Sequence, residues 1–176
     1  SGSFSASLST SGMSDGGGVG SGNCSCCLNF GGTAPLKLIV SLSGIANNSL
    51  CLNCTTLNGA YYLDATSAHA GSGASCSWIY AIPFDSCPGA PSTFDYINLY
   101  VHWFCTYIAI VLYNRINKDS VYWWDAGTTP PNKLCCSAAP LSLTNFTYGG
   151  LWRPASGGTP RCNFSSSSAN IQVPAC

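Results

Sequence analysis

The pattern of apolar and polar positions along the chain is that of a β-protein. Eight segments show period-two alternation or short runs rich in Val, Ile, Tyr, Phe and Trp, and clusters of Gly, Pro, Asn, Asp and Ser separate them. The predicted strands are 36–43, 59–64, 75–82, 94–104, 106–114, 120–125, 140–148 and 170–174. Strands of this length and spacing favour an all-β fold, an antiparallel sandwich or barrel.

The first 22 residues have a pattern of their own. Serine takes every odd position from Ser1 to Ser11, while Phe4, Ala6 and Leu8 take even positions. This period of two predicts a strand over 1–12 with those three side chains on one face. The stretch SDGGGVGSG at 14–22 has the composition of a flexible tether. We therefore expect an N-terminal extension, 1–22, followed by a β domain, 23–176.

One apolar stretch, YINLYVHWFCTYIAIVLY at 96–113, is almost long enough for a membrane helix, which needs about 20 residues. It contains Asn98 and His102 and is rich in β-branched and aromatic residues. Two buried strands explain it better than a membrane span.

Twelve cysteines indicate an oxidising compartment and a disulfide-stapled domain. Their pairing cannot be read from the sequence. The expected disulfide residues are Cys24, Cys26, Cys27, Cys51, Cys54, Cys76, Cys87, Cys105, Cys135, Cys136, Cys162 and Cys176.

Two features constrain that pairing. Neighbouring side chains on a strand point to opposite faces, so Cys26 and Cys27 should bond different partners, as should Cys135 and Cys136. A bond at Cys176 would hold the carboxyl end. The C-x-x-C at 51–54 lacks the second cysteine knuckle of a zinc site and the helix of a redox pair, so we expect no bound metal.

Charge and composition exclude several functions. Charged residues make up 7% of the chain and the net charge is zero, so no basic surface is available for nucleic acid. No phosphate-binding or dinucleotide motif occurs, and we expect no cofactor. His69, His102 and the six aspartates show no catalytic spacing, and the G-x-S-x-G at 12–16 lies in the tether. We therefore predict no catalytic residues and a non-enzymatic protein.

Five N-x-[ST] motifs make glycosylation a hypothesis that would also explain how a chain with so few charges stays in solution. The candidate asparagines are Asn23, Asn47, Asn53, Asn145 and Asn163.

Adjacent tryptophans mark a candidate binding surface. Trp123 and Trp124 lie in a predicted strand, so they face opposite sides and one of them should be exposed. An exposed indole can stack on a sugar ring or on another protein. Both residues are therefore candidates for sugar stacking.

The segment CLNCTTLNGAYYLD at 51–64, followed by CSWIY at 76–80, carries the pattern C-x-x-C-x-x-L-N-G-x-Y-x-L and then Cys-x-Trp. It is similar to a pattern in small secreted cysteine-rich proteins of planctomycete-type bacteria. The resemblance covers about residues 51–80. It implies a secreted bacterial β-protein and brings no site residue with it.

Two functions fit these observations. The first is a structural subunit of an extracellular filament or surface assembly, in which Phe4, Ala6 and Leu8 of one copy enter the sheet of the next. The second is a secreted carbohydrate-binding or adhesive module that uses exposed aromatics. The expected partners are copies of the chain itself or glycans, and the expected location is extracellular or at the cell surface.

Overall fold

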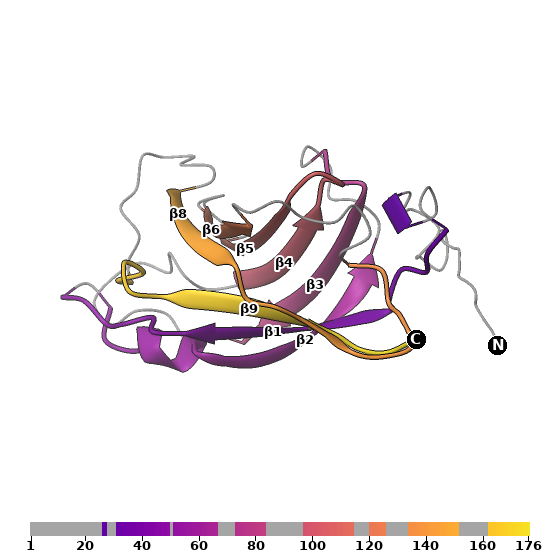
Figure 1. The fold of residues 1–176 in the computed structure, drawn as a ribbon. Coiled ribbons are helices and arrows are strands. Elements are labelled where there is room, and N and C mark those ends of the chain that lie inside the picture. The colour runs from indigo at the N-terminus through magenta and orange to yellow at the C-terminus, as the bar shows by residue number, and fades with distance from the viewer. Residues whose placement is uncertain are drawn as a thin grey trace.

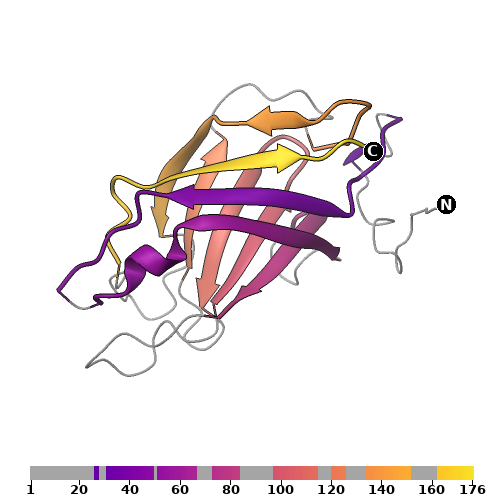
Figure 2. The same ribbon diagram turned by 90° about the horizontal axis from the view of Figure 1, so that it is seen from below.

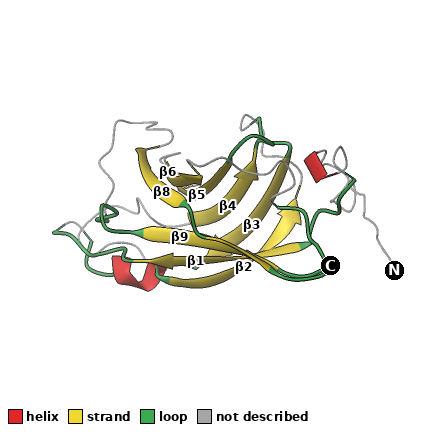
Figure 3. Cartoon of the chain, in the orientation of Figure 1, coloured by secondary structure: helices red, strands yellow, loops and turns green. Residues whose placement is uncertain are grey.

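The computed structural model describes residues 26–27, 31–49, 51–66, 73–83, 97–114, 120–125, 134–151 and 162–176. Within them the chain forms nine strands and the short 3-10 helix η2 (Cys54–Leu57), and Cys26 and Cys27 lie in a further helical piece, as Figures 1 and 3 show. The strands are β1 (Lys37–Ser43), β2 (Gly59–Thr66), β3 (Cys76–Ile82), β4 (Ile97–Trp103), β5 (Ile108–Asn114), β6 (Ser120–Asp125), β7 (Leu141–Leu143), β8 (Phe146–Leu151) and β9 (Ser168–Val173).

The nine strands form one antiparallel sheet in the order β7-β9-β1-β2-β3-β4-β5-β6-β8. The sheet folds over on itself, so that β9, β1 and β2 run across β3 to β6 in Figure 2. Strands β7 and β8 lie at opposite ends of the sheet, yet only Thr144 and Asn145 separate them along the chain. The two ends therefore meet, and the predicted all-β sandwich or barrel is confirmed as a nearly closed barrel.

Most predicted strands are present, with bounds that differ by a few residues. The apolar stretch 96–113 forms β4 and β5, which confirms the two buried strands. The segment 140–148 was predicted as one strand, and this is wrong because it divides into β7 and β8. At Thr144 and Asn145 the chain passes from one end of the sheet, where β7 pairs with β9, to the other end, where β8 pairs with β6. Local periodicity does not predict such a change of pairing partner.

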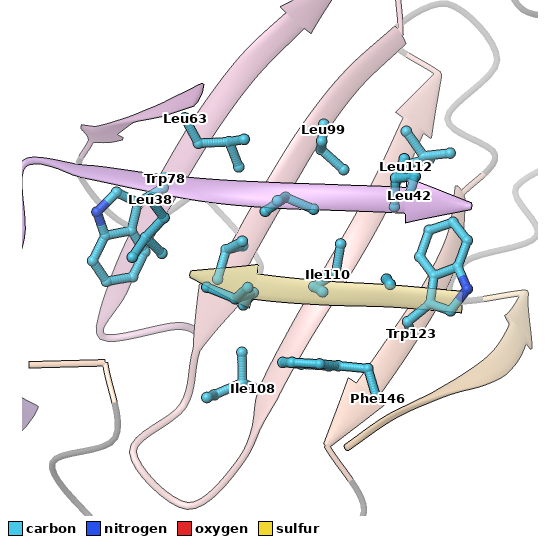
Figure 4. Packing of buried hydrophobic residues seen from close by; sticks show 14 of the residues in the cluster. Leu38, Leu42, Leu63, Trp78, Leu99, Ile108, Ile110, Leu112, Trp123 and Phe146 are labelled. Atoms are coloured by element: carbon cyan, nitrogen blue, oxygen red, sulfur yellow. The ribbon is translucent and has the colours of Figure 1, made fainter. Parts of the chain in front are cut away.

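The core lies between the two crossing layers, and Figure 4 shows its side chains pointing into that space. Trp78, Trp103 and Trp123 are fully buried. The indole nitrogens of Trp78 and Trp123 donate hydrogen bonds to the Pro35 carbonyl oxygen and to Ser167 Oγ, both at 2.9 Å. A buried indole N–H usually finds such a partner, whereas that of Trp103 has no hydrogen-bond partner among the described residues.

Side chains close the corner between β8 and β9, where no ladder of backbone hydrogen bonds joins the two strands. The rings of Tyr148 and Phe164 stack with centroids 5.9 Å apart, and Trp123 packs against both at 5.9–6.0 Å. Aromatic contacts of this kind therefore complete the barrel.

Four disulfides join distant parts of the described chain: Cys26–Cys105, Cys27–Cys135, Cys54–Cys162 and Cys136–Cys176. Cys51 and Cys76 are also disulfide-bonded. The different partners expected for Cys26 and Cys27, and for Cys135 and Cys136, are confirmed. The predicted disulfide at Cys176, which holds the carboxyl end, is also confirmed. Cys24 and Cys87 lie outside the described residues.

Candidate functional site

An aromatic cleft lies on the outer face of the sheet, at the end formed by β5, β6 and β8. Its volume is about 290 Å³, and the described residues that line it are Tyr107, Tyr122, Trp124 and Leu151. Trp124 is 38% exposed and Leu151 37% exposed. We call this site the aromatic cleft.

Strand alternation places two of these rings. In β6, Val121 and Trp123 point into the core, so Tyr122 and Trp124 point outward from the same strand. Trp124 lies in register between Ala109 of β5 and Thr147 of β8, and Tyr122 lies between Val111 and Gly150. Small neighbours on both sides leave room above the sheet for the two rings.

A bulge in β8 makes room for Tyr122. The register shifts between Tyr122 and Trp123, so that Gly149 is the extra residue in β8. A Cβ atom on Gly149 would lie 2.3 Å from Cζ of Tyr122, far inside van der Waals contact. The absence of a side chain at Gly149 therefore lets the Tyr122 ring lie across the edge strand.

The turn between β4 and β5 places Tyr107. Its carbonyl oxygen accepts a hydrogen bond of 2.9 Å from the Phe104 backbone N–H, and the two rings stack with centroids 4.6 Å apart. Cys105, in the middle of the turn, has a positive φ of 67° and is bonded to Cys26. A disulfide thus holds the turn that presents Tyr107.

The cleft has the chemistry of a site for a neutral, amphipathic ligand. None of its described lining residues is charged, and the phenol groups of Tyr107 and Tyr122 each offer a hydroxyl that donates and accepts hydrogen bonds. The exposed Thr147, opposite Trp124, adds a third hydroxyl on this face. Flat rings with a hydroxyl rim match the apolar faces and polar edges of a sugar.

The structure separates the two tryptophans predicted for sugar stacking. Trp123 is fully buried and packs against Tyr148 and Phe164, so its prediction as a stacking residue is wrong. Trp124 is the exposed member of the pair and lines the cleft. Tyr107, Tyr122 and Leu151 were not predicted from the sequence. Only Tyr122 could have been predicted, because it lies two positions before Trp124 and so faces the same side of the strand.

The candidate catalytic residues within the described residues do not form an accessible site. His102 is 5% exposed, and its Nδ1 lies 2.9 Å from Oγ of the fully buried Ser77. Its ring stacks on Tyr100 at 4.9 Å. His102 is therefore a hydrogen-bonded histidine within β4, and burial keeps the pair away from any substrate. Asp64 forms an exposed ion pair with Lys37.

The sulfur atoms of Cys51, Cys54 and Cys162 lie within 4.8 Å of one another, as in a metal site. All three are disulfide-bonded, and Cys54 and Cys162 are bonded to each other. A disulfide sulfur is not the thiolate that ligates zinc. The cluster is therefore a junction of disulfides beside η2.

Four of the candidate glycosylation sites lie in the described residues. Asn47, Asn145 and Asn163 are exposed, whereas Asn53 is half-buried beside the bonded Cys54. Oδ1 of Asn163 accepts hydrogen bonds from the backbone N–H and the hydroxyl of Ser165, at 3.1 and 2.7 Å. Asn23 lies outside the described residues, as do Phe4, Ala6 and Leu8.

Comparison with known proteins gives no match. No protein-family model matches the chain, and no curated protein or solved structure does either. The resemblance to planctomycete proteins therefore stays a prediction. In the part of the chain that the structure describes, no helix is long and apolar enough to cross a membrane.

Proposed function

We propose that the protein is a non-enzymatic, extracellular binding module that holds a neutral carbohydrate in the aromatic cleft. The exposed ring of Trp124, flanked by the two tyrosines in a cleft without described charged residues, is the observation that carries the proposal. The disulfides support the location, because bonds of this number persist in oxidising compartments.

In this proposal each aromatic residue of the cleft has a task. Trp124 presents its indole face to the C–H face of a sugar ring, and Tyr107 and Tyr122 bond the hydroxyl groups at the edge of that ring. The volume of about 290 Å³ lies just below the range for small-ligand sites, about 300–1,000 Å³. A short segment of a glycan therefore fits the cleft better than a large folded partner.

Calorimetric titration with a panel of neutral oligosaccharides tests the proposal. Trp124→Ala should raise the Kd by about 30-fold, because removing an aromatic anchor costs about 2 kcal/mol or more. Tyr62→Ala is the matched control, since Tyr62 is 59% exposed on β2 and does not line the cleft. Equal losses in both variants, or no binding by the unmodified chain, would contradict the proposal.

A second candidate is the structural subunit predicted from residues 1–22. It is favoured by the short pairing of β2 with β3, which only three register pairs join among the described residues, so that an added strand would find unpaired backbone beyond those pairs. Deleting 1–22 should abolish polymers seen by electron microscopy and leave carbohydrate binding unchanged. Polymers that persist after the deletion would exclude strand donation.

A further inference from the structure

The sheet is incomplete between β2 and β3. Only three pairs join the two strands, Asp64 with Ile79, Ala65 with Trp78 and Thr66 with Ser77. Beyond them, within the part of the chain that the structure describes, Gly59–Leu63 of β2 pairs only with β1 and Tyr80–Ile82 of β3 pairs only with β4. We call this gap the β2–β3 opening.

Two tyrosines stand in the opening. The rings of Tyr61 and Tyr80 approach to 5.5 Å between centroids, and Tyr80 remains 36% exposed. The Tyr61 hydroxyl donates a hydrogen bond of 2.6 Å to the Leu57 carbonyl oxygen. Ala60, Tyr62 and Ala81 are exposed beside them. The opening thus combines unpaired strand backbone with half-covered aromatic surface, which is what an added strand requires.

We propose that residues 1–12 of the same chain dock in the β2–β3 opening and complete the sheet. The apolar positions of this segment run from Phe4 to Leu8, five residues that match the five of Gly59–Leu63, about 16 Å in extended form. Phe4, Ala6 and Leu8 then face Tyr61 and Tyr80, and the serines between them face water.

The connecting segment is long enough for this docking. Cys26 lies near the start of β3, where its sulfur is 2.7 Å from Ser75 Oγ, and the opening is at the far end of that strand. The seven residues of β3 span about 23 Å. Residues 13–25 reach about 45 Å when extended, so the chain can return to its own opening.

Docking within one chain is favoured over docking between chains at ordinary concentrations. A tethered segment meets its own site at an effective concentration in the millimolar range. A second copy competes only near that concentration, through exchange of the same strand. Filament growth of the kind predicted from the sequence would then depend on concentration, with the closed monomer as its starting form.

Hydrogen exchange measured by mass spectrometry tests the proposal, with the full chain compared with a chain that lacks residues 1–22. Alternate amides of Gly59–Leu63 point away from β1, and docking should slow their exchange at least about tenfold. The deletion should remove this protection and leave β4 and β5 unchanged. A synthetic peptide of residues 1–12, added to the shortened chain, should restore it.

A matched pair of variants tests which side chains of the docked segment face Tyr61 and Tyr80. Leu8→Asp should abolish the protection as the deletion does, because Leu8 faces the tyrosines, whereas Ser7→Asp should leave it intact. Equal exchange with and without residues 1–22 would overturn the proposal. Protection that appears only as the protein concentration rises would assign the docked strand to a second copy and would also overturn it.

Discussion

Replacing Gly149 with alanine should disturb the aromatic cleft through one side chain, that of Tyr122. The added Cβ would lie 2.3 Å from Cζ of Tyr122 and 2.5 Å from Cε2, so the ring must move. Overpacking costs about 1–3 kcal/mol, and the lower end of this range applies here because the displaced atoms are the far end of a half-exposed side chain. The free energy of unfolding should therefore fall by about 1 kcal/mol, and carbohydrate affinity should fall with it because Tyr122 lines the cleft.

A double-mutant cycle isolates this contact. In a Tyr122→Ala background the clash is absent, and alanine is favoured over glycine in a strand by about 0.5–1 kcal/mol. Gly149→Ala should then be neutral or stabilising, which gives a coupling energy of about 1–2 kcal/mol between the two sites. Guanidinium unfolding followed by tryptophan fluorescence measures all four proteins.

Gly150→Ala serves as the control for the cycle. Gly150 has a φ of +94° and open space around its Cβ position, so its substitution strains the backbone without touching Tyr122. Its cost should be the same with and without the tyrosine ring. A coupling energy near zero for Gly149, or an equal coupling for Gly150, would refute the placement of Tyr122 over the β8 bulge.

Three further predictions concern the fold and its surface. Burial raises the pKa of Tyr61 and the pKa of Tyr148, and the neighbouring Tyr80 raises the pKa of Tyr61 further. The stabilising contribution of the two groups is therefore complete below pH 10 and is lost as the pH rises through the raised pKa values. The free energy of unfolding should therefore fall less steeply above pH 10 when both are replaced by phenylalanine. Gly44→Ala should destabilise the protein by about 2 kcal/mol more than Gly73→Ala, as measured by denaturant unfolding. Both glycines have φ near +70°, but only at Gly44 would an added Cβ lie 2.4 Å from a backbone oxygen, that of Ser166. In a host that glycosylates, Asn145→Gln and Asn163→Gln should each lower the intact mass by one glycan, whereas Asn53→Gln should not, because that side chain is half-buried.

The sequence predicted the strands well because their signals are local. Strand β6 has the predicted bounds, and the opposite facing of Trp123 and Trp124 follows from the pleat of a single strand. Cys26 and Cys27 have the different partners that were predicted, although the two residues are helical and do not lie in the strand from which the prediction was made. For β6, neighbouring residues carry the whole argument.

The aromatic cleft could not be predicted in full because its parts come from distant segments. Tyr107 joins the cleft through the β4–β5 turn, and Leu151 joins it through the pairing of β8 with β6. The strand order and the register of pairing bring these residues together, and hydrophobic periodicity predicts neither of them. For the same reason, no local signal showed which tryptophan of the pair would lie in the core.

Heteronuclear NMR of chain labelled with ¹⁵N-tryptophan tests the central claim most directly, because each indole N–H gives its own signal. On titration with a neutral oligosaccharide that binds, the Trp124 signal should shift, because its ring lines the cleft. The signals of Trp78 and Trp123 should stay in place, since internal hydrogen bonds hold both indoles in the core. A ligand that binds and leaves the Trp124 signal unmoved would contradict carbohydrate recognition at the aromatic cleft.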